Sequence, residues 1–291
     1  MSFHLKRHES SLEAIKRTVR DQAEIAISEL GDETETLSER IHDFRKRCKK
    51  IRAILRLGKP WLTNYKTENA WYRDAARTFS SSRDSDALKE AVRELRHVCR
   101  KSEFGDVIDW LEAQLPNASH LDAMTPHIAE QIQQLRGAMQ RISTWNCKDS
   151  KEADLIDGLK ATYSQAVTAF QQVQNEGSDE QWHEFRKQAK YYWYHTRFLQ
   201  RLWPAIMECV SNELDQLTEL LGDDHDLAVL KTHLPGDDSE QAQAACHLIA
   251  DRRKQLQEDA IELSNRLFAE QPKALAKRFH RYSATWTTVE S

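Results

Sequence analysis

Residues 41–56, IHDFRKRCKKIRAILR, recur in the second half of the chain as residues 182–197, WHEFRKQAKYYWYHTR. At an offset of 141 the shared side chains are His42/His183, Phe44/Phe185, Arg45/Arg186, Lys46/Lys187, Lys49/Lys190 and Arg56/Arg197. A second pair of segments follows in the same order, FSSSRDSDAL (79–88) and LGDDHDLAVL (221–230), and aligns Asp84 with Asp226. This recurrence predicts an internal duplication, with halves at residues 1–145 and 146–291.

Apolar residues recur at three- and four-residue spacing along almost the whole chain, as in SLEAIKRTVRDQAEIAISEL (11–30), which is typical of amphipathic helices. The pattern predicts helices near 10–30, 37–57, 67–79, 85–115 (with a break near Gly105), 121–145, 150–175, 180–202, 205–221, 239–269 and 272–281. Thr36 with Glu39, and Ser178 with Gln181, fit capping boxes at two helix starts. About four long helices in each half predict an all-α fold of two antiparallel bundles.

The composition excludes several other classes of protein. Only 8 Gly and 6 Pro occur in 291 residues, so a many-stranded sandwich or barrel lacks its turn residues. No apolar run approaches the ~20 residues that span a bilayer, and the polar start MSFHLKRHES does not look like a signal peptide. The five cysteines form no Cys-x-x-Cys pair, which favours free thiols in a reducing compartment. We therefore expect a cytoplasmic protein.

Positive charge is concentrated in the repeated segments. The chain has a net charge of −4, yet residues 41–56 carry +6 and residues 182–201 carry +4. At roughly 100° per residue, the basic residues of each copy share one helix face: His42, Arg45, Lys46, Lys49, Arg52 and Arg56, and then His183, Arg186, Lys187, Lys190 and Arg197. This basic face borders the apolar face of each copy, formed by Ile41, Phe44, Cys48, Ile51 and Leu55, and by Trp182, Phe185, Ala189 and Tyr192.

Such an arrangement indicates an anionic partner. Like charges three or four residues apart repel by a few tenths of a kcal/mol per pair, and an anion would relieve that repulsion. Arg offers a planar fork to phosphate oxygens, Lys a mobile charge, and His a further donor once an anion favours its protonated form. The alternative is a solvated face whose cations pair with some of the 46 Asp and Glu side chains.

The pattern His-x-x-Arg-Lys with further cations at helical spacing, followed by Arg-Asp or His-Asp before the next helix, is present twice and resembles the CHAD family (conserved histidine α-helical domain) over about residues 10–285. The resemblance implies two four-helix bundles related by a pseudo-two-fold axis, a basic central channel that binds inorganic polyphosphate, and an association with cytoplasmic polyphosphate granules. By motif match the binding role falls to His42, Arg45, Lys46, Lys49, His183, Arg186, Lys187 and Lys190.

Further basic residues are expected to extend this track or to support it from neighbouring helices. Arg52, Arg56 and Arg197 are expected to extend it, and Lys16, Arg20, Arg93 and Arg96 are candidates on neighbouring helices. The sequence departs from the family pattern where Phe79-Ser80 replaces a Leu-Gly pair, and where Trp193 takes the place of Arg52 beside Tyr192 and Tyr194. These rings could stack with bases, but packing in the core or at its rim is the favoured interpretation.

Three other functions stay open. Glu94-x-x-His97 and Glu180-x-x-His183 match half of a di-iron carboxylate site, although Arg186 and Lys187 near His183 oppose a metal dication. A nucleic-acid binder could use the same basic faces, but the overall acidity disfavours broad duplex binding. A protein-interaction bundle is the third alternative.

No nucleophile and base stand in a recognisable pattern, so we expect neither catalysis nor a cofactor. The acidic run 223–226 could hold a metal, but the favoured interpretation is a helix end with Asp226 as the next N-cap.

Overall fold

A computed structural model describes residues 3–79, 81–99, 104–115, 125–148, 153–175, 177–235 and 239–288, with the side chains of residues 81–86 excepted. Across these residues the regular structure is helical, and a single isolated antiparallel bridge joins Leu62 and Cys147. The all-α prediction is therefore confirmed. No helix in the described part of the chain is both long and apolar enough to cross a membrane.

The α-helices are α1 (Ser11–Gly31), α2 (Leu37–Leu57), α3 (Tyr65–Arg77), α4 (Ser81–Val98), α5 (Gly105–Ala113), α6 (Thr125–Arg141), α7 (Leu155–Val173), α8 (Asp179–Phe198), α9 (Pro204–Thr232), α10 (Glu240–Leu267) and α11 (Pro272–Thr288). Two short 3-10 helices, η2 (Ile142–Thr144) and η3 (Gln200–Leu202), follow α6 and α8.

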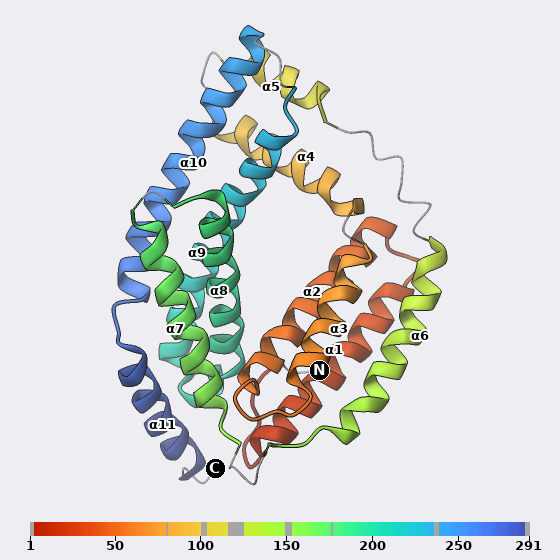
Figure 1. Cartoon of the computed structure of the whole chain (residues 1–291), viewed down its shortest axis with the longest axis vertical. Helices are drawn as coiled ribbons and strands as arrows, with labels where there is room; N and C mark the ends of the chain where they lie inside the picture. Colours follow the sequence, from red (N-terminus) through yellow and green to blue (C-terminus); the bar gives the residue numbers. More distant parts are fainter. Residues whose placement is uncertain are drawn as a thin grey trace.

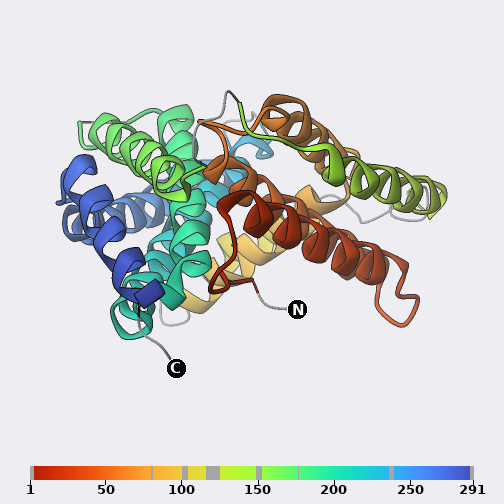
Figure 2. The same ribbon diagram turned by 90° about the horizontal axis from the view of Figure 1, so that it is seen from below.

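Most of the helices pack in two groups that meet along α2 (Figure 1). In the first group α1 packs on α2 and α6, and α2 packs on α3. In the second group α8 packs between α7 and α9, while α10 lies on α9 and α11 on α7. Helix α2 contacts both α7 and α8, and Figure 2 shows the two groups side by side when the molecule is seen from below.

The pair α4 and α5 packs mainly on α9 and α10. Apolar side chains of these four helices form a second core cluster, which includes Leu88, Val92, Leu95, Ile108, Leu111, Leu227, Leu230, Leu248, Ile249 and Leu256. Helix contacts thus cross the predicted boundary near residue 145, and the division into halves at that point stays a prediction.

Both predicted capping boxes are present and fix the starts of α2 and α8. Thr36 accepts a hydrogen bond from the Glu39 backbone N–H, and Glu39 accepts one in return from Thr36 N. Ser178 and Gln181 make the same reciprocal pair. Because each box satisfies amides that the first turn leaves without partners, it contributes about 1 kcal/mol to helix stability.

The apolar face predicted for each repeated segment lies in the core. Each of its residues in α2 and α8 is at most 5 % exposed. These residues are Ile41, Phe44, Cys48, Ile51, Leu55, Trp182, Phe185, Ala189 and Tyr192. Trp193 and Tyr194 are also buried, which confirms the packing interpretation of these rings. The basic residues of α2 and α8 therefore lie on the helix faces that are not buried in the core.

Helices α7 and α8 both contact α2 near its C-terminal end. Gly158 of α7 lies directly against the Leu57 backbone, where a Cβ atom would overlap it. His195 of α8 is completely buried and donates a hydrogen bond from Nε2 to the Ala53 carbonyl oxygen at 2.7 Å. Burial lowers the pKa of His195 to about 3, so the imidazole is neutral at this contact. These two contacts hold the C-terminal end of α2 against α7 and α8.

The prediction of a helix end at Leu221 with Asp226 as an N-cap is wrong. Helix α9 continues without interruption from Pro204 to Thr232. The acidic run stays helical because the buried Asp224 carboxylate accepts hydrogen bonds at 2.9 Å from Arg253 Nε and Gln257 Nε2, both on α10. The Arg-Asp of the first copy, at 83–84, likewise lies inside α4 and not before it.

Three other helix predictions need adjustment. The single helix expected over 85–115 is divided into α4 and α5, and α5 begins at Gly105, where a break was expected. Helix α6 begins at Thr125, and residues 116–124 lie outside the described residues. Helix α11 runs to Thr288, beyond the predicted end at residue 281.

Candidate anion-binding site

Four of the predicted site residues line one pocket between α2 and α8. Arg45 and Lys49 come from α2, and His183 and Arg186 come from α8. The pocket has a volume of about 250 Å³ and is completed by Ala87 and Leu88 of α4 and by His225, Asp226 and Val229 of α9. We call this the basic pocket.

Helix geometry explains why these four residues meet. Arg45 and Lys49 are four residues apart on α2, and His183 and Arg186 are three apart on α8, so each pair shares a helix face. The apolar faces of both helices are buried, which aims the adjoining basic faces toward the space between them. Arg45 Nη1 donates to the Ala76 carbonyl oxygen of α3 at 3.2 Å, and Arg186 lies over α9 beside Gly222.

Two histidines stand together in the basic pocket. The rings of His183 and His225 have centroids 4.7 Å apart. Burial lowers the pKa of His183, and the nearby charges of Arg186 and Lys187 lower it further. For His225, burial and then Arg186 and His183 lower the pKa to about 4. The pocket therefore disfavours additional positive charge until an anion enters.

His225 was not among the predicted binding residues. Its position beside Asp226 in the second repeated segment was visible in the sequence, but the expected helix end placed both residues in a loop. Because α9 continues as a helix, His225 faces α8 and lies next to His183. The signal in the sequence was the His-Asp pair itself.

Seven of the eleven predicted binding residues lie outside the lining of the basic pocket, and three of these are Lys187, Lys46 and His42. Lys187 pairs with Glu184 on the same helix, and Lys46 pairs with Asp43 at 3.8 Å. His42 is exposed and lines a separate shallow hollow with Ser38, Glu39 and Asp43. These positions can affect a ligand that extends out of the basic pocket but do not line its wall.

The cations expected to extend the track contact polar or aromatic neighbours. Arg52 Nε donates to Asn69 Oδ1 at 3.4 Å, and Arg56 Nη1 donates to Gln165 Oε1 at 3.3 Å. The Arg56 guanidinium also stacks over Tyr191, 4.0 Å from its ring centroid. Both arginines are partly buried, and they link α2 to α3, α7 and α8.

Lys190 and Arg197 both lie over the ring of Trp193. The Lys190 ammonium is 4.0 Å from the Trp193 ring centroid, and the Arg197 guanidinium is 4.8 Å from it. Lys190 Nζ also donates to Thr218 Oγ1 of α9 at 3.1 Å. Burial is the main cause that lowers the pKa of Lys190 to about 8, and it lowers that of the nearby Lys50 to the same value.

The four candidates on neighbouring helices do not line the basic pocket. Arg93 pairs with Glu90 at 2.5 Å, and Arg96 pairs with Asp109 at 2.6 Å, so both are neutralised within α4 and α5. Lys16 donates to the Ser143 carbonyl oxygen at 3.2 Å, and Arg20 is exposed on α1.

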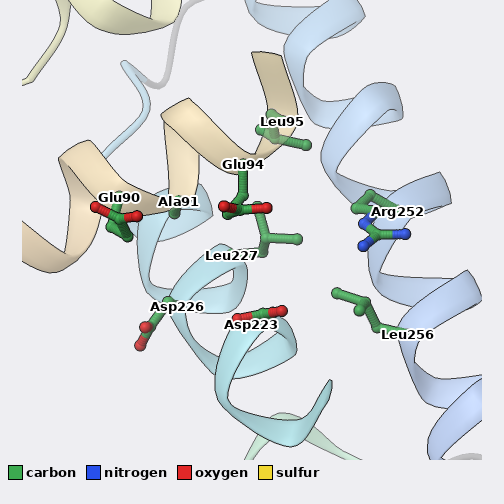
Figure 3. A pocket seen from close by; sticks show the side chains of 9 residues that line it. All are labelled: Glu90, Ala91, Glu94, Leu95, Asp223, Asp226, Leu227, Arg252 and Leu256. Carbon is green, nitrogen blue, oxygen red and sulfur yellow. The ribbon is translucent and has the colours of Figure 1, made fainter. Parts of the chain in front are cut away.

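A second, acidic cavity adjoins the basic pocket, between α4, α9 and α10 (Figure 3). We call its four carboxylates, Glu90, Glu94, Asp223 and Asp226, the acidic wall. Glu90, Glu94, Asp223 and Asp226 line a small cavity of about 30 Å³, with Arg252 on its far side. Burial, then the charges of Glu94 and Asp226, raise the pKa of Asp223 to about 6. Asp226 lines both cavities and thus brings a carboxylate to the edge of the basic pocket.

The two Glu-x-x-His pairs of the di-iron alternative are separated in the structure. Glu94 belongs to the acidic wall on α4, whereas His183 lines the basic pocket from α8. Over the described residues, no three His, Cys, Asp or Glu side chains gather in a way that could hold a metal ion. The geometry of these pairs does not support a di-iron centre.

Comparison with known families gives the same result as the repeated segments. A family model of the CHAD domain matches residues 21–235, which include both basic segments and both segments that contain Asp84 and Asp226. The chain belongs to the CHAD family. All four helices that line the basic pocket, α2, α4, α8 and α9, lie entirely within the matched CHAD region.

A solved structure shares the fold of this CHAD-family chain at low sequence identity. It is PptA from Streptomyces chartreusis, which is 13 % identical, with a TM-score of 0.58. The similarity covers 89 % of this chain and 99 % of that one. No curated protein matches the sequence.

Proposed function

We propose that this CHAD-family protein binds inorganic polyphosphate in the basic pocket and does not hydrolyse it. One observation carries the proposal: Arg45 and Lys49 of α2 meet His183 and Arg186 of α8 around a single pocket. In the sequence, Arg45 and Arg186 are the same position of the repeated segment. The match to the CHAD family supports it.

The chemistry of the pocket suits a chain of phosphates. Arg45 and Arg186 can each offer two parallel N–H donors to phosphate oxygens, and Lys49 adds a compact charge. Cations four residues apart on a helix are separated by about 6 Å along its axis, so a linear anion can contact several of them in turn. The ligand would also offset the repulsion between these cations.

The basic pocket is, in this proposal, the narrow part of a basic channel between two bundles that arose by duplication. Arg52, Arg56, Lys190 and Arg197 would extend the track toward the C-terminal ends of α2 and α8, and His42, Lys46 and Lys187 would meet the ligand at the opposite end. We further propose a cytoplasmic location with association to polyphosphate granules.

Titration of the purified protein with polyphosphates of graded length tests the proposal. We expect long chains to bind, and at least about 20-fold weaker binding when salt rises from about 50 to about 200 mM, because Arg45, Lys49 and Arg186 would each neutralise a phosphate and so release counterions. Excess polyphosphate should displace any nucleic acid that is bound in the basic pocket, and no orthophosphate should be released. If the protein bound polyphosphate of no length, the proposal would be rejected in favour of a protein-interaction bundle.

Affinity for polyphosphate should increase as the pH falls. In the free protein the pKa values of His183 and His225 are lowered, that of His225 to about 4. A bound polyanion raises both pKa values, so binding takes up protons between the free and the bound pKa. Affinity therefore rises as the pH drops through the bound-state pKa and levels off below the free-state pKa. Isothermal titration at about pH 7.5 and about pH 5.5 should give a several-fold gain at the lower value.

The control for this pH dependence is the double variant H183Q/H225Q, which retains hydrogen-bonding side chains without a titrating ring. It should bind polyphosphate with nearly the same affinity at both pH values. Circular dichroism at each pH confirms that the protein is folded. An equal pH dependence in wild type and variant would show that these histidines are not the protonated groups.

A further inference from the structure

A second hollow lies where η3 and the start of α9 meet the C-terminal half of α11. It has a volume of about 740 Å³, and its lining includes Arg7, Arg201, Trp203, Tyr282, Thr285 and Trp286. None of its lining residues belongs to the basic pocket. We call this hollow the aromatic groove.

The aromatic groove presents ring surface to solvent. Trp203, at the start of α9, is 47 % exposed, whereas most large apolar side chains in the described part of the chain are buried. The Trp203 and Tyr282 rings meet edge to face, with centroids 4.9 Å apart, and Arg7 lies over the Trp286 ring at 5.7 Å. An exposed tryptophan that is braced by a second ring is a ready platform for another flat ring.

A row of cations leads along α11 to this groove. Lys273, Lys277 and Arg281 are each four residues apart, and the next position of the row is Thr285, which lines the groove. The same cations, together with Lys160 and His280, border an open hollow of about 440 Å³ whose lining contains no carboxylate.

Among the described residues, no carboxylate forms an ion pair with a cation of this row. No Asp or Glu occurs in residues 272–288. The neighbouring Arg278 and His280 face Glu270 and Asp154, but within the described residues no ion pair is formed by Lys160, Lys273, Lys277 or Arg281. In a chain of net charge −4, such a row indicates a ligand that carries several negative charges.

We propose that the aromatic groove and the α11 row bind single-stranded nucleic acid. An unpaired base stacks on Trp203, and the phosphates that follow it lie along Arg281, Lys277 and Lys273, about 6 Å apart along the helix axis. Polyphosphate has no ring to use the groove, and a duplex keeps its bases stacked inside. The overall acidity that disfavours a broad duplex interface is compatible with this narrow local track.

Binding of a fluorescent oligothymidylate to the full chain, measured by anisotropy at low salt, tests this proposal. An abasic oligomer of the same length supplies the same phosphates without bases. We expect the thymidine oligomer to bind about tenfold more tightly than the abasic one, since each stacked base contributes about that factor or more. The W203A variant should reduce the affinity for oligothymidylate to the abasic level, and W203F should retain it within about threefold.

Two further arms separate this site from the others. The variant R45Q/R186Q, which changes only the basic pocket, should bind oligothymidylate as the wild type does whether or not polyphosphate binding is lost. Thymidine triphosphate should bind much more weakly than the oligomer, because it cannot follow the α11 row; equal affinities would overturn the proposal of a strand. Equal affinity for thymidine and abasic oligomers, or an unchanged affinity in a folded W203A protein, would also overturn it.

Discussion

Replacing Arg45 and Arg186 together by glutamate should weaken the binding of long-chain polyphosphate by about 100-fold or more. Both guanidinium groups line the basic pocket, and hydrogen bonds to charged groups contribute about 1.5–3 kcal/mol each. Loss of two such contacts amounts to about 3 kcal/mol at least, which is about two factors of ten in affinity. The new carboxylates add repulsion toward phosphate. Titration of the R45E/R186E protein at about 0.1 M salt, where the Debye length is about 10 Å, measures the effect.

The matched control for this reversal is R136E/R266E, which changes the net charge by the same amount. Arg136 on α6 and Arg266 on α10 are exposed and lie away from the basic pocket. This control should lose less than about threefold in affinity, because charges beyond a Debye length are largely screened. If the charge-reversed protein does not fold, the milder variant R45Q/R186Q, which removes the two positive charges without adding carboxylates, can be titrated in its place. If a folded R45E/R186E protein bound polyphosphate as tightly as the control does, the basic pocket would not be the binding site.

Replacing Gly158 by alanine should destabilise the protein by about 3 kcal/mol or more. A Cβ atom at this position of α7 would overlap the Cα and carbonyl oxygen of Leu57, and would lie 2.5 Å from its carbonyl carbon. Backbone atoms within α2 cannot rotate out of the way, so α7 and α2 would have to separate. Overpacking typically costs about 1–3 kcal/mol, and a clash with backbone belongs at or above the top of that range.

The same substitution at Gly137 provides the comparison. Gly137 lies within α6, and a Cβ atom there would meet nothing within 4 Å. G137A should therefore stabilise the protein by about 0.5–1 kcal/mol, because alanine loses less backbone entropy in a helix than glycine. Urea unfolding of the two variants gives both values. A G158A protein as stable as the wild type would contradict the close packing of α7 on α2.

The features that the sequence predicts well are local along one helix. The capping boxes at Thr36 and Ser178 and the buried faces of α2 and α8 follow from spacings of three and four residues, and the structure confirms them. The pairs Lys46–Asp43 and Lys187–Glu184 are also three residues apart, so the sequence contained the information that these cations have partners within their own helix.

The features that the sequence does not predict depend on contacts between distant segments. The length of α9 is set by Asp224, whose partners Arg253 and Gln257 lie 29 and 33 residues further along the chain. A run of acidic residues alone suggests a helix end, because the local sequence does not show that Arg253 and Gln257 will pair with Asp224. The placement of His225 beside His183, and the meeting of Trp203 with Tyr282, likewise require the packed helices.

The packing of α4 and α5 on α9 and α10 has a consequence for synthesis on the ribosome. Leu88 leaves the exit tunnel 139 residues before Leu227, with which it shares a core cluster. Domains generally fold from the N-terminus during translation, so α4 emerges with Leu88, Val92 and Leu95 uncovered until α9 follows. Because such non-local contacts form slowly, these three apolar side chains stay exposed during much of the elongation of the nascent chain. We therefore expect chaperones to have their longest opportunity to bind at α4.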